Sequence, residues 1–142
     1  MSEIFFFNEG CELPFFLLPE KIRKWLDLVA SDYSCRIGTI SFVFCDDSYI
    51  LDVNKKYLNH DYYTDVITFD YRENDILSGD VFISLDTVQS NALEFSTTFE
   101  NELNRVMVHS VLHLIGFKDK TDEDAKLMRK NEDHCLGLLK TL

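Results

Sequence analysis

Two histidines four residues apart, followed by a glycine and an aspartate, set the strongest constraint on this chain. If the segment is helical, His109 and His113 project from the same face, one turn apart. Gly116 allows the chain to leave the helix through the left-handed conformation common at helix ends. The turn that follows can bring Asp119 back towards both imidazoles. The stretch therefore predicts a helix, a glycine exit and a loop around one metal ion, with His109, His113 and Asp119 as ligands.

This ligand set predicts a catalytic metal, because three protein ligands leave a fourth position for water. The alternative is that the two histidines are simply packed and hydrogen-bonded among apolar neighbours. The glycine and the oxygen ligand at a workable distance favour the metal site. The helix pattern agrees, because Glu102 and Arg105 share the stripe of the histidines, away from the apolar residues.

The chain has 142 residues, which predicts a single domain, residues 1–142, large enough to bury a proper core. There is no apolar run of about 18 residues, as a membrane span would need. The first residues lack the basic flank of a secretory signal. Four scattered cysteines without a CxxC pair predict free, mostly buried thiols. We therefore expect a cytoplasmic protein without membrane contact.

The net charge of −11 argues against tight non-specific binding to nucleic acid, which usually needs a basic footprint. Solvated helix faces or loops explain the three small basic groups as well as phosphate binding does: Lys21, Arg23 and Lys24; Lys55 and Lys56; Lys118 and Lys120. A bound metal adds positive charge that the sequence tally does not contain. Acidity alone therefore does not exclude a phosphate-containing substrate.

Hydrophobic periodicity and capping residues predict both strands and helices. Strands are expected at 4–7, 39–44, from Val66, and at 81–85, the first buried on both faces and the last two joined as a hairpin. Helix starts are expected at Pro19, Asp46 or Asp47, Asp86, a capping box of Thr97 with Glu100, and Thr121. The prediction is an α+β fold, a compact domain with a mixed sheet of about four strands covered by helices.

A metal site of this type supports hydrolysis, because zinc lowers the pKa of a bound water towards 7 and polarises a phosphoryl or carbonyl oxygen. The histidine spacing also occurs in metzincin proteases, where a glutamate directly after the first histidine is the general base. That position holds Ser110, which cannot do this work. The sequence therefore disfavours a metalloprotease.

Four segments, in matching order and spacing, resemble the YbeY family of metal-dependent endoribonucleases and rRNA maturation factors, over nearly the whole chain from about Ile4. Residues 109–119, HSVLHLIGFKD, resemble the family pattern H-G-x-L-H-L-x-G-Y-D-H. Residues 64–69, TDVITF, and 79–84, GDVFIS, are similar to T-D-V-L-S-F and G-D-I-x-I-S. Met128 and Glu132 fall where the family's closing helix carries these residue types.

The resemblance implies a zinc-dependent endoribonuclease, specific for single-stranded RNA, that matures the 3′ end of small-subunit (16S) rRNA and takes part in ribosome quality control. A water on the metal would be the nucleophile or the base towards the 2′-hydroxyl. The implied partners are rRNA, small ribosomal subunit proteins and a ribosome-associated GTPase. The alternative is a ribosome-assembly factor that binds rRNA and protein partners, with a structural metal and little catalysis.

Three departures from the family pattern matter for function. Asp119 replaces a third histidine; a carboxylate is an accepted zinc ligand, but it makes a bound water a weaker acid and gives manganese or another harder metal more weight as the alternative to zinc. Ser110 replaces a glycine. Leu58 replaces an arginine that, by the resemblance, contacts RNA phosphate, and a leucine cannot stabilise phosphate charge. Candidate replacements for that arginine are Lys55, Lys56, His60 and Arg72.

Asp65 and His60 are candidate helpers of the metal ligands. Asp65, with Thr64, could hydrogen-bond the site or orient a water, or it could order the loop that enters the strand. His60 could shuttle protons, because its unperturbed pKa lies near neutrality, or it could be an ordinary exposed loop histidine. Tyr62 and Tyr63 could stack on unpaired bases or pack at the strand entrance.

Overall fold

The computed structural model, which describes residues 2–60 and 64–142, is built around a four-stranded sheet with strand order β1-β2-β4-β3. Its strands are β1 (Glu3–Glu9), β2 (Arg36–Cys45), β3 (Val66–Asp70) and β4 (Ile76–Ser84). The pairs β1/β2 and β2/β4 are parallel, whereas β3 and β4 form an antiparallel hairpin. The predicted mixed sheet and the predicted hairpin are both confirmed.

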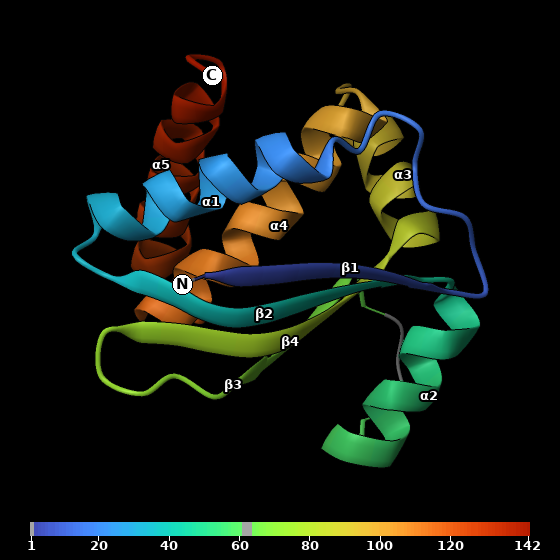
Figure 1. Cartoon of the computed structure of the whole chain (residues 1–142). Helices are drawn as coiled ribbons and strands as arrows, with labels where there is room; N and C mark the ends of the chain where they lie inside the picture. Colours follow the sequence, from blue (N-terminus) through green and yellow to red (C-terminus); the bar gives the residue numbers. More distant parts are fainter. Residues whose placement is uncertain (1, 61–63) are drawn as a thin grey trace.

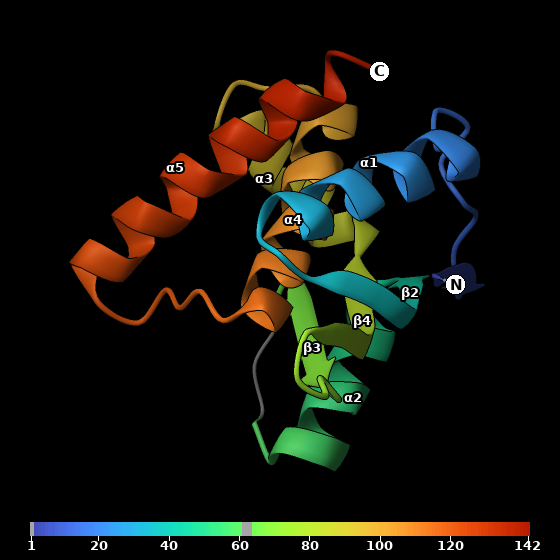
Figure 2. The same ribbon diagram turned by 60° about the vertical axis from the view of Figure 1, so that its left-hand side comes forward.

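Helices cover the two faces of this sheet unequally (Figures 1 and 2). One side carries most of the helical mass: α1 (Pro19–Asp32), α3 (Leu85–Glu94), α4 (Phe99–Ile115) and α5 (Asp122–Leu139). On the other side, α2 (Asp47–Leu58) packs Ile50 and Val53 against Ile67 of β3. The fold is therefore one compact α+β unit, as the periodicity predicted.

Helix α4, which carries His109 and His113, is the centre of the larger core. It contacts α1, α3, α5 and the strands β3 and β4. Its apolar face is completely buried, and Leu103, Met107 and Leu112 are inaccessible to solvent. Gly79 of β4 lets the last turn of α4 approach the sheet, because a Cβ there would lie 2.5 Å from the carbonyl oxygen of Phe69 and 3.2 Å from Leu114. The helix that carries the site is therefore held rigidly.

Helix caps agree with the sequence prediction at two helices and differ at two. Asp46 caps α2 by accepting from the backbone N–H of Tyr49 at 2.8 Å, and Thr121 caps α5, both as predicted. However, Ser84 caps α3, because the last residue of β4 already turns into the helix and leaves Asp86 in the first turn. The N-cap of α4 is Thr98, one residue after the predicted cap Thr97.

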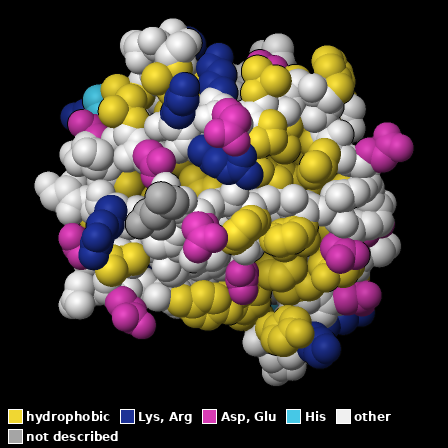
Figure 3. Space-filling view, in the orientation of Figure 1, with side chains coloured by type: hydrophobic (Ala, Val, Ile, Leu, Met, Phe, Trp, Pro, Cys, Tyr) yellow, Lys and Arg dark blue, Asp and Glu magenta, His cyan; other side chains and the backbone are white. Residues whose placement is uncertain are grey.

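The expectation that the first strand is buried on both faces is wrong. β1 lies at the edge of the sheet, so Ile4 is buried towards the helices while Phe5 and Phe7 are 40% and 49% exposed on the opposite face. Hydrophobic side chains gather over the region of the strands and α2 in Figure 3. An apolar run without alternation predicts burial, but it cannot show that the helices on the second face stop short of an edge strand.

The four cysteines are free thiols, of which Cys45 and Cys135 are buried and Cys11 and Cys35 are half-buried, as predicted. Within the described part of the chain, no helix combines the length and the apolar character needed to cross a membrane.

Candidate metal site

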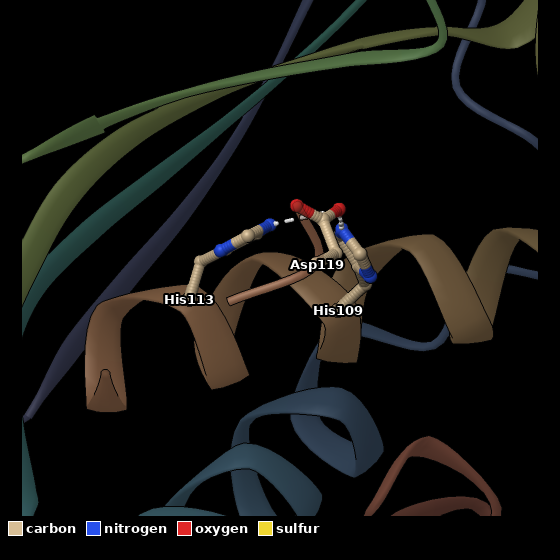
Figure 4. Close-up of side chains that lie close together, drawn as sticks. All are labelled: His109, His113 and Asp119. Carbon is tan, nitrogen blue, oxygen red and sulfur yellow. Dashed lines mark ion pairs between the residues drawn. The ribbon is translucent and has the colours of Figure 1, made fainter. Parts of the chain in front are cut away.

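Three side chains converge at the C-terminal half of α4 (Figure 4). His109 and His113 extend from successive turns of the helix, and Asp119 reaches them from the loop that follows. The Nε2 atom of His109 lies 3.4 Å from Oδ2 of Asp119, and Nε2 of His113 lies 3.5 Å from the same oxygen. One ligand atom of each residue falls within 4.8 Å of the other two.

These separations fit a divalent transition metal. Tetrahedral zinc with bonds of about 2.0–2.1 Å holds its ligand atoms about 3.3 Å apart. The two imidazole rings are nearly perpendicular, at 85°, with centroids 4.6 Å apart, so they face the same point without stacking. Two nitrogens and one carboxylate oxygen form a donor set that could hold such an ion.

The chain reversal after α4 depends on Gly116. Its φ of +128° is in the region that favours glycine, and its backbone N–H bonds to the carbonyl oxygens of Leu112 and His113. The N–H of Phe117 also bonds to the carbonyl oxygen of Leu112, which closes the end of the helix. The loop then carries Asp119 back over the histidines. The glycine exit predicted from the sequence therefore exists.

The other ring nitrogen of each histidine has its own partner. Nδ1 of His113 lies 3.0 Å from the carbonyl oxygen of Phe117, which can only accept, so Nδ1 carries a proton and Nε2 is the ring nitrogen that faces Asp119. Nδ1 of His109 lies 2.6 Å from Oε2 of Glu132 on α5. Both contacts fix the ring orientation and tautomer that a metal ligand requires.

Glu132 belongs to a partly buried ion-pair network between α4 and α5. Its Oε1 accepts from Nη1 of Arg105 at 2.9 Å, and Nη2 of Arg105 bonds to Asp133 at 2.7 Å. Sequence reasoning missed this role of Glu132. Two signals existed, the position of Arg105 on the histidine stripe and the place of Glu132 in the family pattern. However, neither shows that α5 lies against α4.

Burial and neighbouring charges shift the pKa values of the site residues in opposite directions. Burial lowers the pKa of His109, but the hydrogen bond and charge of Glu132, with the charges of Asp119 and Asp65, outweigh it and raise the pKa above the usual value. Burial raises the pKa of Asp65, against the lowering effect of His109. Burial likewise raises the pKa of Glu102. The site thus favours keeping protons when no metal is bound.

Two open depressions meet at the candidate ligands. The first, about 430 Å³, extends along β3 and is lined by Thr64, Asp65, Thr68, Asp70 and His113 among others. The second, about 260 Å³, lies between α4 and α5. His109, Asp119, Asp65 and Val66 line both. Asp65 therefore lines both depressions, and its role as a helper of the candidate ligands stays a prediction.

Comparison with known proteins identifies the family of this chain. The family model described as Endoribonuclease YbeY matches residues 7–140. The chain belongs to the YbeY family. It is 48% identical to Endoribonuclease YbeY of Porphyromonas gingivalis over 139 residues, 98% of this chain and 91% of the relative. It is 49% identical to Endoribonuclease YbeY of Flavobacterium psychrophilum over 115 residues, 81% of this chain and 82% of the relative.

A solved structure has the same fold. The solution structure of TM1509 from Thermotoga maritima superposes with a TM-score of 0.68 at 27% sequence identity. The match covers 99% of this chain and 93% of the other.

Departures from the YbeY pattern can now be located. Leu58 is the last residue of α2 and is 40% exposed. Lys55 and Lys56 lie in the same final turn, and His60 is an exposed residue whose backbone N–H bonds to the carbonyl oxygen of Asn54. None of these four lines either depression at the site. Tyr62 and Tyr63 lie outside the described residues.

Arg72, the remaining candidate replacement, serves a different purpose. Its Nη1 donates to the carbonyl oxygens of Leu114 (3.2 Å) and Ile115, and its Nε donates to that of Asn74. The guanidinium thus satisfies the carbonyls left open at the C-terminus of α4 and offsets the negative end of the helix dipole. Arg72 therefore holds the end of α4 against the β3–β4 hairpin, and its suggested contact with phosphate stays a prediction.

Proposed function

We propose that this member of the YbeY family is a metal-dependent endoribonuclease that cuts single-stranded RNA. In this proposal, His109, His113 and Asp119 hold one zinc ion. The observation that carries it is the convergence of three ligand atoms within 4.8 Å, with the opposite nitrogen of each imidazole already engaged by Glu132 or by the backbone. This preorganisation is typical of a site for a metal and exceeds what core packing of two histidines needs.

When bound, such an ion supplies Lewis acidity towards a phosphoryl oxygen and lowers the pKa of water. The residues of the chain do the positioning. Asp65 lies beside His109 with its pKa raised by burial, so it is suited to exchange a proton with a 2′-hydroxyl or a water. Thr64 and Thr68 offer hydroxyl groups along the same depression. Two depressions that meet at the ligands suit a polymer that passes over the site.

The donor set favours zinc, because two imidazoles and one carboxylate form a common zinc environment. The carboxylate in place of a third imidazole also leaves room for manganese or another divalent metal.

We further propose, from the family membership, that the RNA is the 3′ region of small-subunit rRNA and that the protein acts in the cytoplasm in ribosome maturation and quality control. Small-subunit proteins and a ribosome-associated GTPase are the partners this role would require.

A cleavage assay with two histidine variants tests the proposal. Zinc-loaded protein is incubated with an end-labelled, unstructured RNA, beside His113→Ala and the control His134→Ala. His134 is exposed on α5 and contacts Asp32, away from the site. We expect the parent and His134→Ala to bind one zinc per chain and to cleave, and His113→Ala to do neither.

Equal cleavage by all three proteins would indicate a contaminating nuclease and refute the proposal. If the parent holds one metal without cutting, the alternative of an assembly factor with a structural metal becomes the better hypothesis. The exposed Leu58 and the net charge of −11 are the observations that favour that alternative.

A further inference from the structure

The second depression at the site, which we call the α5 slot, has a charge pattern that the proposed function does not use. Its walls include Glu102, Arg105 and His109 from α4, Arg129 and Glu132 from α5, and Asp119 from the loop between them. At about 260 Å³ it is too small for a large ligand and has room for part of a nucleotide. Figure 2 shows how α5 runs beside α4, joined to it by the loop that carries Asp119.

The two arginines of the slot differ in hydrogen bonding and in exposure to solvent. Arg105 is committed, because both of its terminal nitrogens donate to carboxylates and its side chain is 17% exposed. Arg129 is 58% exposed, and its contact with Glu132 is long, at 3.8 Å. Because the contact is long and the Arg129 side chain is solvated, although Glu132 is only 8% exposed, the guanidinium can turn towards a ligand at small cost.

Two of the four carboxylates that line the slot contact arginine or histidine side chains, and the other two are at least partly buried. Glu132 uses one oxygen for Arg105 and the other for His109. Asp119 faces the two histidines. Glu102 is 6% exposed, and Asp65, which also lines the slot, is partly buried beside His109. Of the two arginines that line the slot, Arg129 is therefore the one whose guanidinium is accessible to a phosphate at its mouth.

Arg129 also stands out among the cations near the site. Within the described residues that line the two depressions, the basic side chains besides histidine are Arg105 and Arg129, and both belong to the slot. The depression along β3 has acidic and neutral polar side chains instead. Acidic side chains outnumber arginines and lysines on both sides of the candidate ligands, but among these lining residues the guanidinium groups that could attract a polyanion lie on the α5 side.

We propose that Arg129 binds a backbone phosphate of the RNA, adjacent to the phosphate that is cleaved, and that the α5 slot is the subsite for this neighbouring nucleotide. The proposal rests on the proposed function and adds a substrate-binding residue to it. A guanidinium suits this task because it donates two parallel hydrogen bonds to phosphate oxygens. The contact exists both before and during the reaction, so it lowers KM and leaves kcat nearly unchanged.

Paired charge variants of α5 test this assignment. Arg129→Gln and the control Lys130→Gln each remove one positive charge from adjacent exposed positions of the same helix, and only Arg129 lines the slot. Binding of the zinc-loaded proteins to a fluorescent single-stranded RNA with 2′-O-methyl groups, which cannot be cut through its 2′-oxygen, is measured across salt concentrations. Cleavage of the unmodified RNA then gives kcat and KM.

We expect Arg129→Gln to make the slope of log K against log salt shallower by about 0.7, the value for one phosphate contact on a single strand. Its KM should rise several-fold at constant kcat and constant zinc content. Arg129→Lys should keep the slope of the parent, and Lys130→Gln should change the slope and KM much less than Arg129→Gln.

Equal slopes and KM values for Arg129→Gln and Lys130→Gln, with a parent that cleaves, would overturn the role of Arg129 and leave the proposed function intact. A fall in kcat at unchanged KM would also overturn it, because that result would indicate an indirect effect through Glu132. A parent that neither binds nor cuts RNA would refute the proposed function itself, and the Arg129 subsite with it.

Discussion

His109 and His113 lie one turn apart on the same helix but are oriented by different parts of the molecule. His109 bonds to Glu132, a side chain on a separate helix that Arg105 holds in place. His113 bonds to the carbonyl oxygen of Phe117, which belongs to the turn that ends its own helix. One candidate metal ligand therefore depends on the packing of α5 against α4, and the other on a local chain reversal. The two halves of the site should fail in different ways.

Removal of Glu132 should have the largest effect. Glu132→Ala leaves His109 without its orienting acceptor and Arg105 without one of its carboxylates. We expect zinc affinity to fall about 10- to 100-fold and the metal-free protein to lose about 3 kcal/mol of stability, since one partner of a buried charge pair is gone. Competition with a zinc chelator and urea unfolding measure the two effects.

Asp133→Ala is the matched control, because Asp133 bonds to the same arginine but its side chain is 60% exposed. It should change both quantities little. Zinc binding by Glu132→Ala at the affinity of the parent would show that the contact between α4 and α5 does not orient His109.

A change at the local turn should have an intermediate effect. Gly116→Ala places a Cβ at φ +128°, where a side chain strains the backbone, although the nearest neighbouring atom is 3.9 Å away. We expect a loss of about 1–2 kcal/mol in urea unfolding. We also expect a smaller fall in zinc affinity than for Glu132→Ala, because the carbonyl of Phe117 shifts without being removed.

Gly137→Ala should have the opposite effect on the free energy of unfolding. Gly137 lies inside α5 with no atom near its missing Cβ, so alanine there should stabilise the protein by about 0.5–1 kcal/mol. If Gly116→Ala were as stable as the parent and bound zinc equally well, the helix end would not control His113.

The smallest effect is a pH dependence of the metal-free protein. The folded-state pKa of His109 is raised above the unfolded value of about 6.5, chiefly by Glu132 against the lowering effect of burial. The stabilisation from the protonated pair is therefore complete below about pH 6.5 and is lost as the pH rises through the folded-state pKa. NMR titration of the imidazole should give a lower pKa for His109 in Glu132→Gln than in the parent.

In urea unfolding, the stability difference between the parent and Glu132→Gln should narrow as the pH is raised from about 6 to about 8.5. The reason is that His109 loses its proton over this range and with it the attraction to Glu132. An unchanged His109 pKa in Glu132→Gln would show that Glu132 carries no charge that the imidazole senses.

The sequence predicted correctly those features that depend only on the local geometry of a short segment. The helix with His109 and His113, the exit at Gly116 and the return of Asp119 depend on the geometry of eleven consecutive residues. Strand and helix types followed from periodicity, and the β3–β4 hairpin followed from neighbouring strands in the chain. Errors at the starts of α3 and α4 were shifts of one or two positions, because several polar residues nearby could each serve as a cap.

The tertiary structure decided what each local feature contacts. No local pattern predicts that Glu132 bonds to His109, 23 positions away in the chain. Nor does a local pattern predict that Arg72 bonds to the end of α4. The exposure of Phe5 and Phe7 likewise follows only from the position of β1 at the edge of the sheet. Backbone geometry determines which side chains of one helix share a face, so the sequence alone determined the three candidate ligands. The partners that orient those ligands come from other elements, and their positions depend on how the whole core packs.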